Sequence, residues 1–126
     1  MITEDYVSFE TAKLLKEKRF NGECHKHYWG YEPGKEFLSS GSYNPEYDYL
    51  APTLQMAMKW LREVHNIAIC ICAYYSTNPY ELNYRNNKPY WKIGIMNHIS
   101  SRYYDSFNNY EEACEAAIKY CLENLI

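Results

Sequence analysis

The chain has 126 residues, of which 47% are apolar and 23% charged, and its formal net charge is −3. This size and balance predict one folded domain over residues 1–126 and exclude a disordered chain. The acidic balance also excludes an overall positive field that would gather nucleic acid or acidic lipids, although a local patch could still do so.

The compartment is predicted from the first residues and the cysteines. Residues 1–5 are polar and acidic, unlike a secretory signal, and no apolar run approaches the ~20 residues that cross a bilayer. The five cysteines form an odd set without the spacing of a disulfide framework. We therefore expect a cytoplasmic protein with free thiols.

The first half of the chain predicts a helix and then a hairpin. A helix over residues 9–19 has Ser8 as its N-cap and ends at Asn21-Gly22. A strand over residues 24–31, a Glu-Pro-Gly-Lys turn at 32–35 and a returning strand over 36–40 follow. Residues 41–51 are rich in Tyr, Asn, Pro and Ser and predict a loop.

The middle of the chain predicts a helix followed by a buried strand. Thr53 caps a helix with one broad apolar stripe, and Asn66 ends it. Residues 67–75 are apolar on both faces, which is typical of a strand in the middle of a sheet. We expect Cys70 and Cys72 of this strand to pack in the core, as we do Cys114 and Cys121 later in the chain.

The last part predicts a long loop, two strands and a helix. Residues 76–89 are polar and form a loop of a length that is often functional or mobile. Strands over 90–96 and 101–105 flank a turn at 97–100, and Asn108 or Asn109 caps a final helix in which Glu115 can pair with Lys119. The order α-β-β-α-β-β-(β)-α predicts the α+β class, with an antiparallel sheet of four to five strands and three helices.

Three segments carry a resemblance to other proteins. They are residues 7–18 (VSFETAKLLKEK), 51–63 (APTLQMAMKWLRE) and 110–113 (YEEA). Together they resemble a group of uncharacterised small proteins encoded by phages and prophages of Bacteroides-type gut bacteria, for which no activity is established. The resemblance covers the three helices and implies an accessory protein that acts in the cytoplasm of a bacterial host cell.

Cys24-His25-Lys26-His27 is the sharpest cluster of metal-ligand residue types. On a strand, alternation places both histidines on one face and the cysteine on the other, so further ligands, such as His65 or His98, would have to come from elsewhere. We expect exposed strand histidines, no metal and no cofactor, and the sequence leaves metal binding by His25 and His27 open.

The chain lacks the residue patterns of common enzyme active sites. It has no nucleophile elbow, P-loop, dinucleotide glycine pattern or His-Glu-x-x-His. We therefore expect a protein that is not an enzyme and assign no catalytic residue.

Tyrosine is the unusual component of the composition, at 15 residues. Tyrosine offers large, stiff, amphipathic contact area, so a surplus in loops is typical of a binding surface. An AT-rich genome, which enriches Tyr and Asn together, is the competing explanation. The candidate surface comprises Tyr28, Trp29, Tyr31, Tyr43, Tyr47, Tyr49, Tyr80, Tyr84, Tyr90 and Trp91.

The leading hypothesis is a protein that binds an unknown protein, either a different chain or a second copy of itself. The alternative is a nucleic-acid-associated phage protein that stacks bases on its aromatic hairpins. Its positive charge would come from a local cluster made up of Lys13, Lys16, Lys18, Arg19 and Lys26.

Overall fold

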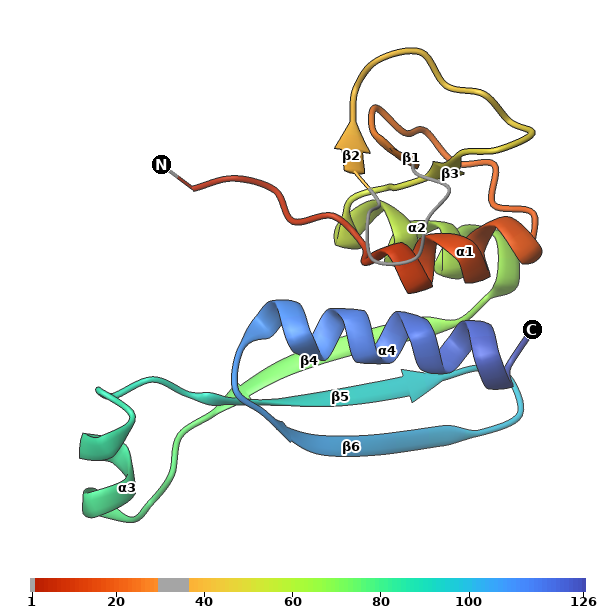
Figure 1. Cartoon of the computed structure of the whole chain (residues 1–126). Helices are drawn as coiled ribbons and strands as arrows, with labels where there is room; N and C mark the ends of the chain where they lie inside the picture. Colours follow the sequence, from red (N-terminus) through yellow and green to blue (C-terminus); the bar gives the residue numbers. More distant parts are fainter. Residues whose placement is uncertain (1, 30–36) are drawn as a thin grey trace.

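The computed structural model describes residues 2–29 and 37–126. Within these ranges the chain forms four helices and six strands (Figure 1), which confirms the predicted α+β class. In chain order they are α1 (Phe9–Glu17), β1 (His27–Trp29), β2 (Phe37–Ser39), β3 (Tyr49–Leu50), α2 (Leu54–His65), β4 (Ala68–Tyr74), α3 (Pro79–Tyr84), β5 (Tyr90–Met96), β6 (Ser101–Phe107) and α4 (Tyr110–Asn124).

The described strands form two antiparallel sheets, with the orders β2-β1-β3 and β4-β5-β6. The prediction of a single sheet of four to five strands with three helices is therefore wrong in its details. The first hairpin completes its sheet with β3, which lies in the predicted loop 41–51, and the predicted loop 76–89 contains α3. Tyr31 and the turn at 32–35 lie outside the described residues.

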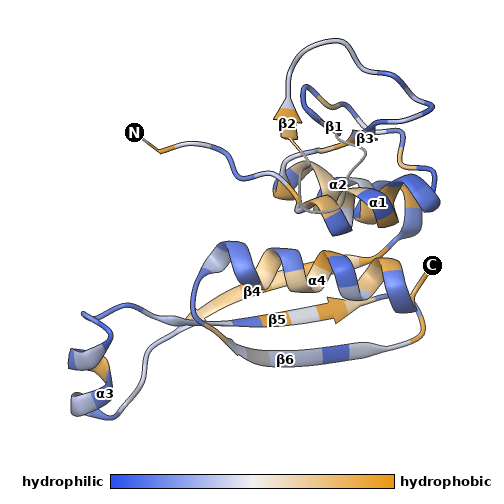
Figure 2. Cartoon of the chain, in the orientation of Figure 1, coloured by the Kyte–Doolittle hydropathy of each residue, from blue (hydrophilic) through white to orange (hydrophobic). Residues whose placement is uncertain are grey.

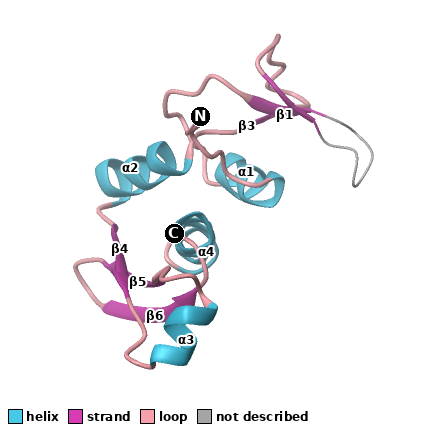
Figure 3. Ribbon diagram, turned by 90° about the vertical axis from the view of Figure 1, so that its left-hand side faces the viewer, coloured by secondary structure: helices cyan, strands magenta, loops and turns pink. Residues whose placement is uncertain are grey.

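Helix α4 lies at the centre of the molecule. Figures 1 and 3 show α1 and α2 on one side of it and the sheet β4-β5-β6 on the other, with the first sheet beyond α1. Side chains from these elements form one cluster of buried residues, in which Leu15, Leu61 and Ile93 pack with Ile118 and Leu122 of α4. Each such side chain stabilises the fold by about 1.5–3 kcal/mol through its removal from water.

The three predicted helices begin where the sequence predicts. The side chains of Ser8, Thr53 and Asn109 each accept a hydrogen bond from the backbone N–H three residues later, at 3.2, 3.1 and 2.8 Å. Asn66 ends α2 in the left-handed conformation, with φ of 55°. The predicted end of the first helix is wrong, because α1 stops at Glu17 and the chain turns at Arg19, whose φ is 62°, before Asn21-Gly22.

Strand β4 lies at an edge of its sheet, and not in the middle as predicted, because β5 pairs with both β4 and β6. In Figure 2 β4 is more hydrophobic than β6. Ile69 and Ile71 pack against the core as alternation predicts, but Cys70 and Cys72 on the other face are exposed. Of the described elements, none covers that second face (Figure 3).

Three of the other strands differ from their predicted boundaries by a few residues. β1 and β2 are shorter than the predicted strands 24–31 and 36–40 within the described residues, and β6 continues to Phe107. β5 matches its prediction.

Of the helices in the described ranges, none combines the length and the apolarity that crossing a membrane requires.

Candidate interaction surface

Helix α3 begins with local signals that are strong for so short an element. The Asn78 side chain accepts a hydrogen bond from the N–H of Tyr80 at 2.9 Å, and Pro79 occupies the first turn, where its missing N–H is not needed. Two residues with positive φ, Asn86 (55°) and Asn87 (62°), turn the chain back after the helix. These signals make residues 79–84 a helix inside the polar stretch that predicts a loop.

The inner face of α3 is anchored to the sheet by Glu81 and Arg85. The Glu81 carboxylate accepts hydrogen bonds from the hydroxyls of Tyr90 and, at 2.8 Å, Ser76. Arg85 donates to the Pro89 carbonyl at 2.8 Å and to the Asn108 side chain at 3.0 Å. Its guanidinium also lies 3.8 Å from the centre of the Tyr90 ring, a cation–π contact.

These contacts shift two pKa values in opposite directions. The hydrogen bonds from Tyr90 and Ser76, with the nearby charge of Arg85, lower the pKa of Glu81. The hydrogen bond to Glu81 raises the pKa of Tyr90. At neutral pH the pair is therefore a phenol that donates to a carboxylate, the charge-assisted form of the bond.

The outer face of α3 carries the two most exposed tyrosines described, Tyr80 (87%) and Tyr84 (88%). They are four residues apart, so they lie about 6 Å apart along the helix axis on one face. Figure 1 shows α3 projecting beyond the end of the sheet. We call α3 and the segments that anchor it, residues 75–90, the arm.

A hollow of about 480 Å³ lies where the arm meets the sheet. It is lined by three tyrosine rings, three small hydroxyl residues and the carboxylate of Glu81: Tyr74, Tyr75, Ser76, Thr77, Glu81, Tyr90 and Ser106. Tyr74 and Tyr90 stack within it, with ring centres 5.6 Å apart. Such a lining suits a side chain with an apolar body and a polar tip.

The predicted surface residues are spread over both the interior and the exterior of the fold. Tyr28 and Tyr49 are half-buried and pack edge-on against Phe9, at 5.6 and 5.4 Å between ring centres. Tyr90 and Trp91 are also half-buried, with Trp91 against Tyr110 at 5.2 Å.

Trp29, Tyr43, Tyr47, Tyr80 and Tyr84 are exposed, and the structure gathers only the last two on one element. Sequence reasoning named all these residues but could not separate the packed rings from the exposed ones. The signal that it missed was the Asn78-Pro79 helix start.

The basic residues near the first helix are partly engaged within the chain. Lys16 donates to the carbonyls of Pro45 and Asp48, both at 2.9 Å, and Lys18 donates to that of Ile126 at 2.8 Å. Lys13 and Lys26 lie over the rings of Phe9 and Tyr6. These contacts fix the directions of the four lysine side chains and leave their positive charges in place.

The two histidines of the Cys-His-x-His cluster do not share an exposed face. His25 is exposed beside Glu23, whereas His27 is buried at 4% and its Nε2 lies 3.7 Å from the buried carboxylate of Asp48. The prediction of exposed strand histidines is wrong for His27, because β1 is the middle strand of its sheet and His27 is buried between β2 and β3. His25 precedes β1, so the alternation of a strand does not place it on the same face as His27. Among the described residues, no three His, Cys, Asp or Glu side chains come together as metal ligands.

The cysteines differ in burial, and Cys24 is half-buried. Cys114 and Cys121 are buried as predicted, and burial raises their pKa values to about 11 and about 12, so both are unreactive thiols at neutral pH. Cys70 and Cys72 are exposed, which contradicts the prediction of core packing.

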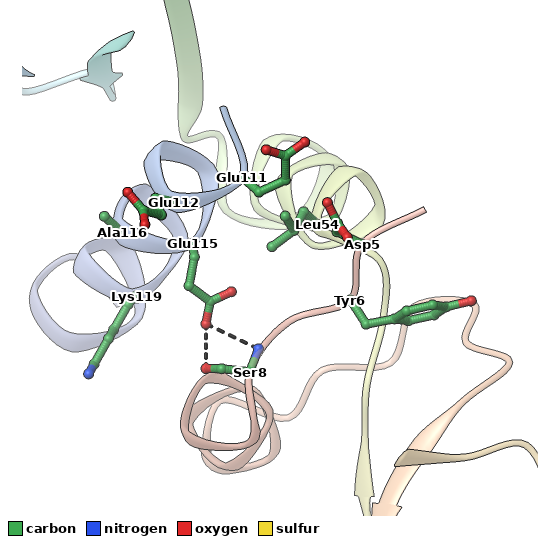
Figure 4. A pocket seen from close by; sticks show the side chains of 9 residues that line it. All are labelled: Asp5, Tyr6, Ser8, Leu54, Glu111, Glu112, Glu115, Ala116 and Lys119. Atoms are coloured by element: carbon green, nitrogen blue, oxygen red, sulfur yellow. Dashed lines mark hydrogen bonds between the residues drawn. The ribbon is translucent and has the colours of Figure 1, made fainter. Parts of the chain in front are cut away.

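A second hollow, an acidic groove of about 510 Å³, lies between the N-terminal segment and α4 (Figure 4). Its wall includes the carboxylates of Asp5, Glu111 and Glu112, and Glu115 reaches across it to Ser8. Lys119 bonds to Glu10 at 3.0 Å, and not to Glu115 as the helical spacing predicts. The hydrogen bonds from Ser8 to Glu115 across this groove hold the start of α1 against α4.

No family model, curated protein or solved structure matches this chain.

Proposed function

We propose that this protein binds another protein through the arm and does not act as an enzyme. The observation that carries the proposal is the two-sided construction of α3. Glu81 bonds to Tyr90 of β5 and Arg85 bonds to Asn108 after β6, which fastens one face to the body. Tyr80 and Tyr84 are held outward with nearly all of their surface in water. Anchored helices lose little conformational freedom on binding, which favours affinity.

The energetics of exposed tyrosine support this surface over the others. An aromatic side chain offers about 150–250 Å² for burial. At roughly 25 cal/mol per Å², covering one such ring contributes on the order of 4 kcal/mol before the costs of association. Tyrosine is also among the residues that most often dominate binding energy at protein interfaces. The best partner is a protein with two adjacent apolar pockets that contain hydrogen-bond acceptors for the phenols.

The setting of this interaction is part of the same proposal. The resemblance of the predicted helices to phage and prophage proteins supports an accessory role in the cytoplasm of a bacterial host cell. Nucleic acid binding remains the alternative hypothesis, and titration of a labelled single-stranded oligonucleotide at low salt tests it, with Lys13→Glu as the variant that should weaken binding.

Affinity capture with three baits tests the proposal. The baits are the wild-type chain, the double variant Tyr80→Ala/Tyr84→Ala and the control Tyr47→Ala, which removes an exposed tyrosine from the loop before β3. We expect a host protein enriched by the wild type and the control, and reduced about 30-fold or more by the double variant, as a loss of about 2 kcal/mol requires.

The solution mass of the same baits identifies self-association. A wild-type dimer that becomes a monomer in the double variant would make a second copy the partner. Capture that is equal for all three baits, or a strict monomer that captures nothing, would contradict the proposal.

A further inference from the structure

Strand β4 presents two thiols side by side on the surface. Cys70 and Cys72 are two residues apart, so their side chains point to the same face of the strand, and their sulfur atoms lie 3.2 Å apart. Both residues are exposed. A reduced cysteine is ordinarily one of the most buried residue types, so an exposed pair is unusual.

The neighbouring strand leaves both thiols accessible. Gly94 lies opposite Cys70 in the sheet and has no side chain, and the ring of Tyr103 lies over Gly94 on the same face as Cys70, 3.0 Å from where a Cβ of residue 94 would stand. Cys70 remains exposed beside this ring. Lys92 lies opposite Cys72, but its ammonium group is turned toward the ring of Tyr74, 4.6 Å from the ring centre. A reagent in solution can therefore reach both sulfurs from one direction.

The spacing of the sulfurs suits one kind of chemistry. Two residues along a strand separate the Cα atoms by about 6.6 Å, close to the upper limit for a disulfide, so a disulfide would strain the strand. With bonds of about 2.3 Å, typical of thiolate ligation, sulfurs 3.2 Å apart subtend roughly 90° at a shared atom. Pyramidal trivalent arsenic bonds near this angle, whereas tetrahedral zinc and linear copper(I) require wider ones.

The number of available ligands also favours trivalent arsenic over zinc. No third His, Cys, Asp or Glu side chain joins the pair within the described residues, so a structural zinc site would lack ligands. A trivalent arsenic atom that already carries one organic group needs only two sulfurs. The hydrogen bond with Cys72 raises the pKa of the Cys70 thiol, which slows disulfide exchange because exchange requires a thiolate.

We propose that Cys70 and Cys72 form a surface dithiol site that binds monosubstituted trivalent arsenicals through both sulfurs. The hydrated arsenical carries two hydroxyl groups on arsenic. Each thiol gives its proton to one hydroxyl, two arsenic–oxygen bonds break, two arsenic–sulfur bonds form, and two waters leave. Arsenic remains trivalent, so the reaction needs no oxidant or reductant.

Intact-mass analysis of the reduced full-length chain with equimolar phenylarsine oxide tests this site. We expect one phenylarsenic group per chain, protection of Cys70 and Cys72 from alkylation, and release by dithiothreitol but not by an equal thiol concentration of mercaptoethanol. Cys70→Ser and Cys72→Ser should each weaken binding about 100-fold or more, because the second bond forms at high effective concentration. Both substitutions lie on the surface and should leave the fold intact.

Cys24→Ser is the matched control and should bind the arsenical as the wild type does, because Cys24 lies outside β4. Equal binding by either β4 variant, or loss of binding in the control, would overturn the proposal. So would two β4 thiols that resist both the arsenical and a small aromatic disulfide in the native protein, since they would then be covered in solution. None of these outcomes depends on the arm.

Discussion

The Glu115 carboxylate on α4 accepts hydrogen bonds from both the backbone N–H and the hydroxyl of Ser8, the residue that caps α1. The same oxygen accepts from the hydroxyl of buried Thr11 at 2.5 Å. One side chain thus joins the first helix to the last across 107 residues of sequence.

Replacing Glu115 should loosen this junction. We expect Glu115→Ala to lower the free energy of unfolding by about 1–3 kcal/mol. Hydrogen bonds to a charged group are lost, and the buried Thr11 hydroxyl loses the carboxylate to which it donates. Urea unfolding measures the change. Glu63→Ala, which removes an exposed carboxylate from α2, should change it by less than about 0.5 kcal/mol. Equal changes in the free energy of unfolding of the two variants would contradict a stabilising role of the Glu115 hydrogen bonds.

Gly22 lies against the ring of buried Phe20. A Cβ at position 22 would be 2.6 Å from the Phe20 ring, which packs on Trp60 with ring centres 5.3 Å apart. We expect Gly22→Ala to destabilise the protein by about 1–3 kcal/mol through overpacking. Thermal unfolding checks this against Gly41→Ala, whose Cβ would meet only the Ser39 hydroxyl at 3.3 Å. A Gly22→Ala protein as stable as the wild type would show that Phe20 can move.

Arg85 should hold the arm without supporting the rest of the fold. We expect Arg85→Ala to speed hydrogen exchange of the α3 amides roughly 5- to 30-fold, as a loss of about 1–2 kcal/mol implies. Exchange in α4 should not change. Lys88→Ala is the control, since it removes an exposed cation nearby and keeps the Arg85 contacts. Unchanged exchange in Arg85→Ala would mean that other contacts fix the arm.

The anchoring of the arm should weaken in acid. Hydrogen bonds from Tyr90 and Ser76 hold the pKa of Glu81 below its ordinary value of 4.5. A carboxyl with a lowered folded pKa adds stability that is present above the ordinary value and is lost as the pH falls through the lowered one. Carbon NMR of Glu81 should give a midpoint below 4.5, and Tyr90→Phe should move it upward. A midpoint that does not move would show that the Tyr90 hydroxyl has no part in the shift.

The elements that the sequence predicts well are those fixed by nearby residues. Ser8, Thr53 and Asn109 each bond to a backbone group three residues away, so their effect is visible in a short window. Helix α3 has the same kind of signal in Asn78-Pro79, and composition alone obscured it. Strand β3 could not be predicted, because its two residues become a strand only by pairing with β1.

Exposure is the property that the sequence leaves undetermined. Tyr28 and Tyr84 are the same residue type, yet one packs on Phe9 and the other is almost fully exposed. Cys70 and Cys114 are both in apolar segments, and only the second is covered by other elements. The difference lies in which layers the fold places over each residue, and no local pattern encodes this.

Photocrosslinking from the arm shows whether a partner protein lies against Tyr84. A photoreactive p-benzoylphenylalanine replaces Tyr84 in one bait and Tyr47 in another, and both are irradiated in host lysate. We predict a specific crosslinked protein from position 84, absent from position 47 and suppressed by excess wild-type chain but not by excess Tyr80→Ala/Tyr84→Ala. A crosslink from position 47 alone, or one that the double variant suppresses equally well, would contradict binding through the arm.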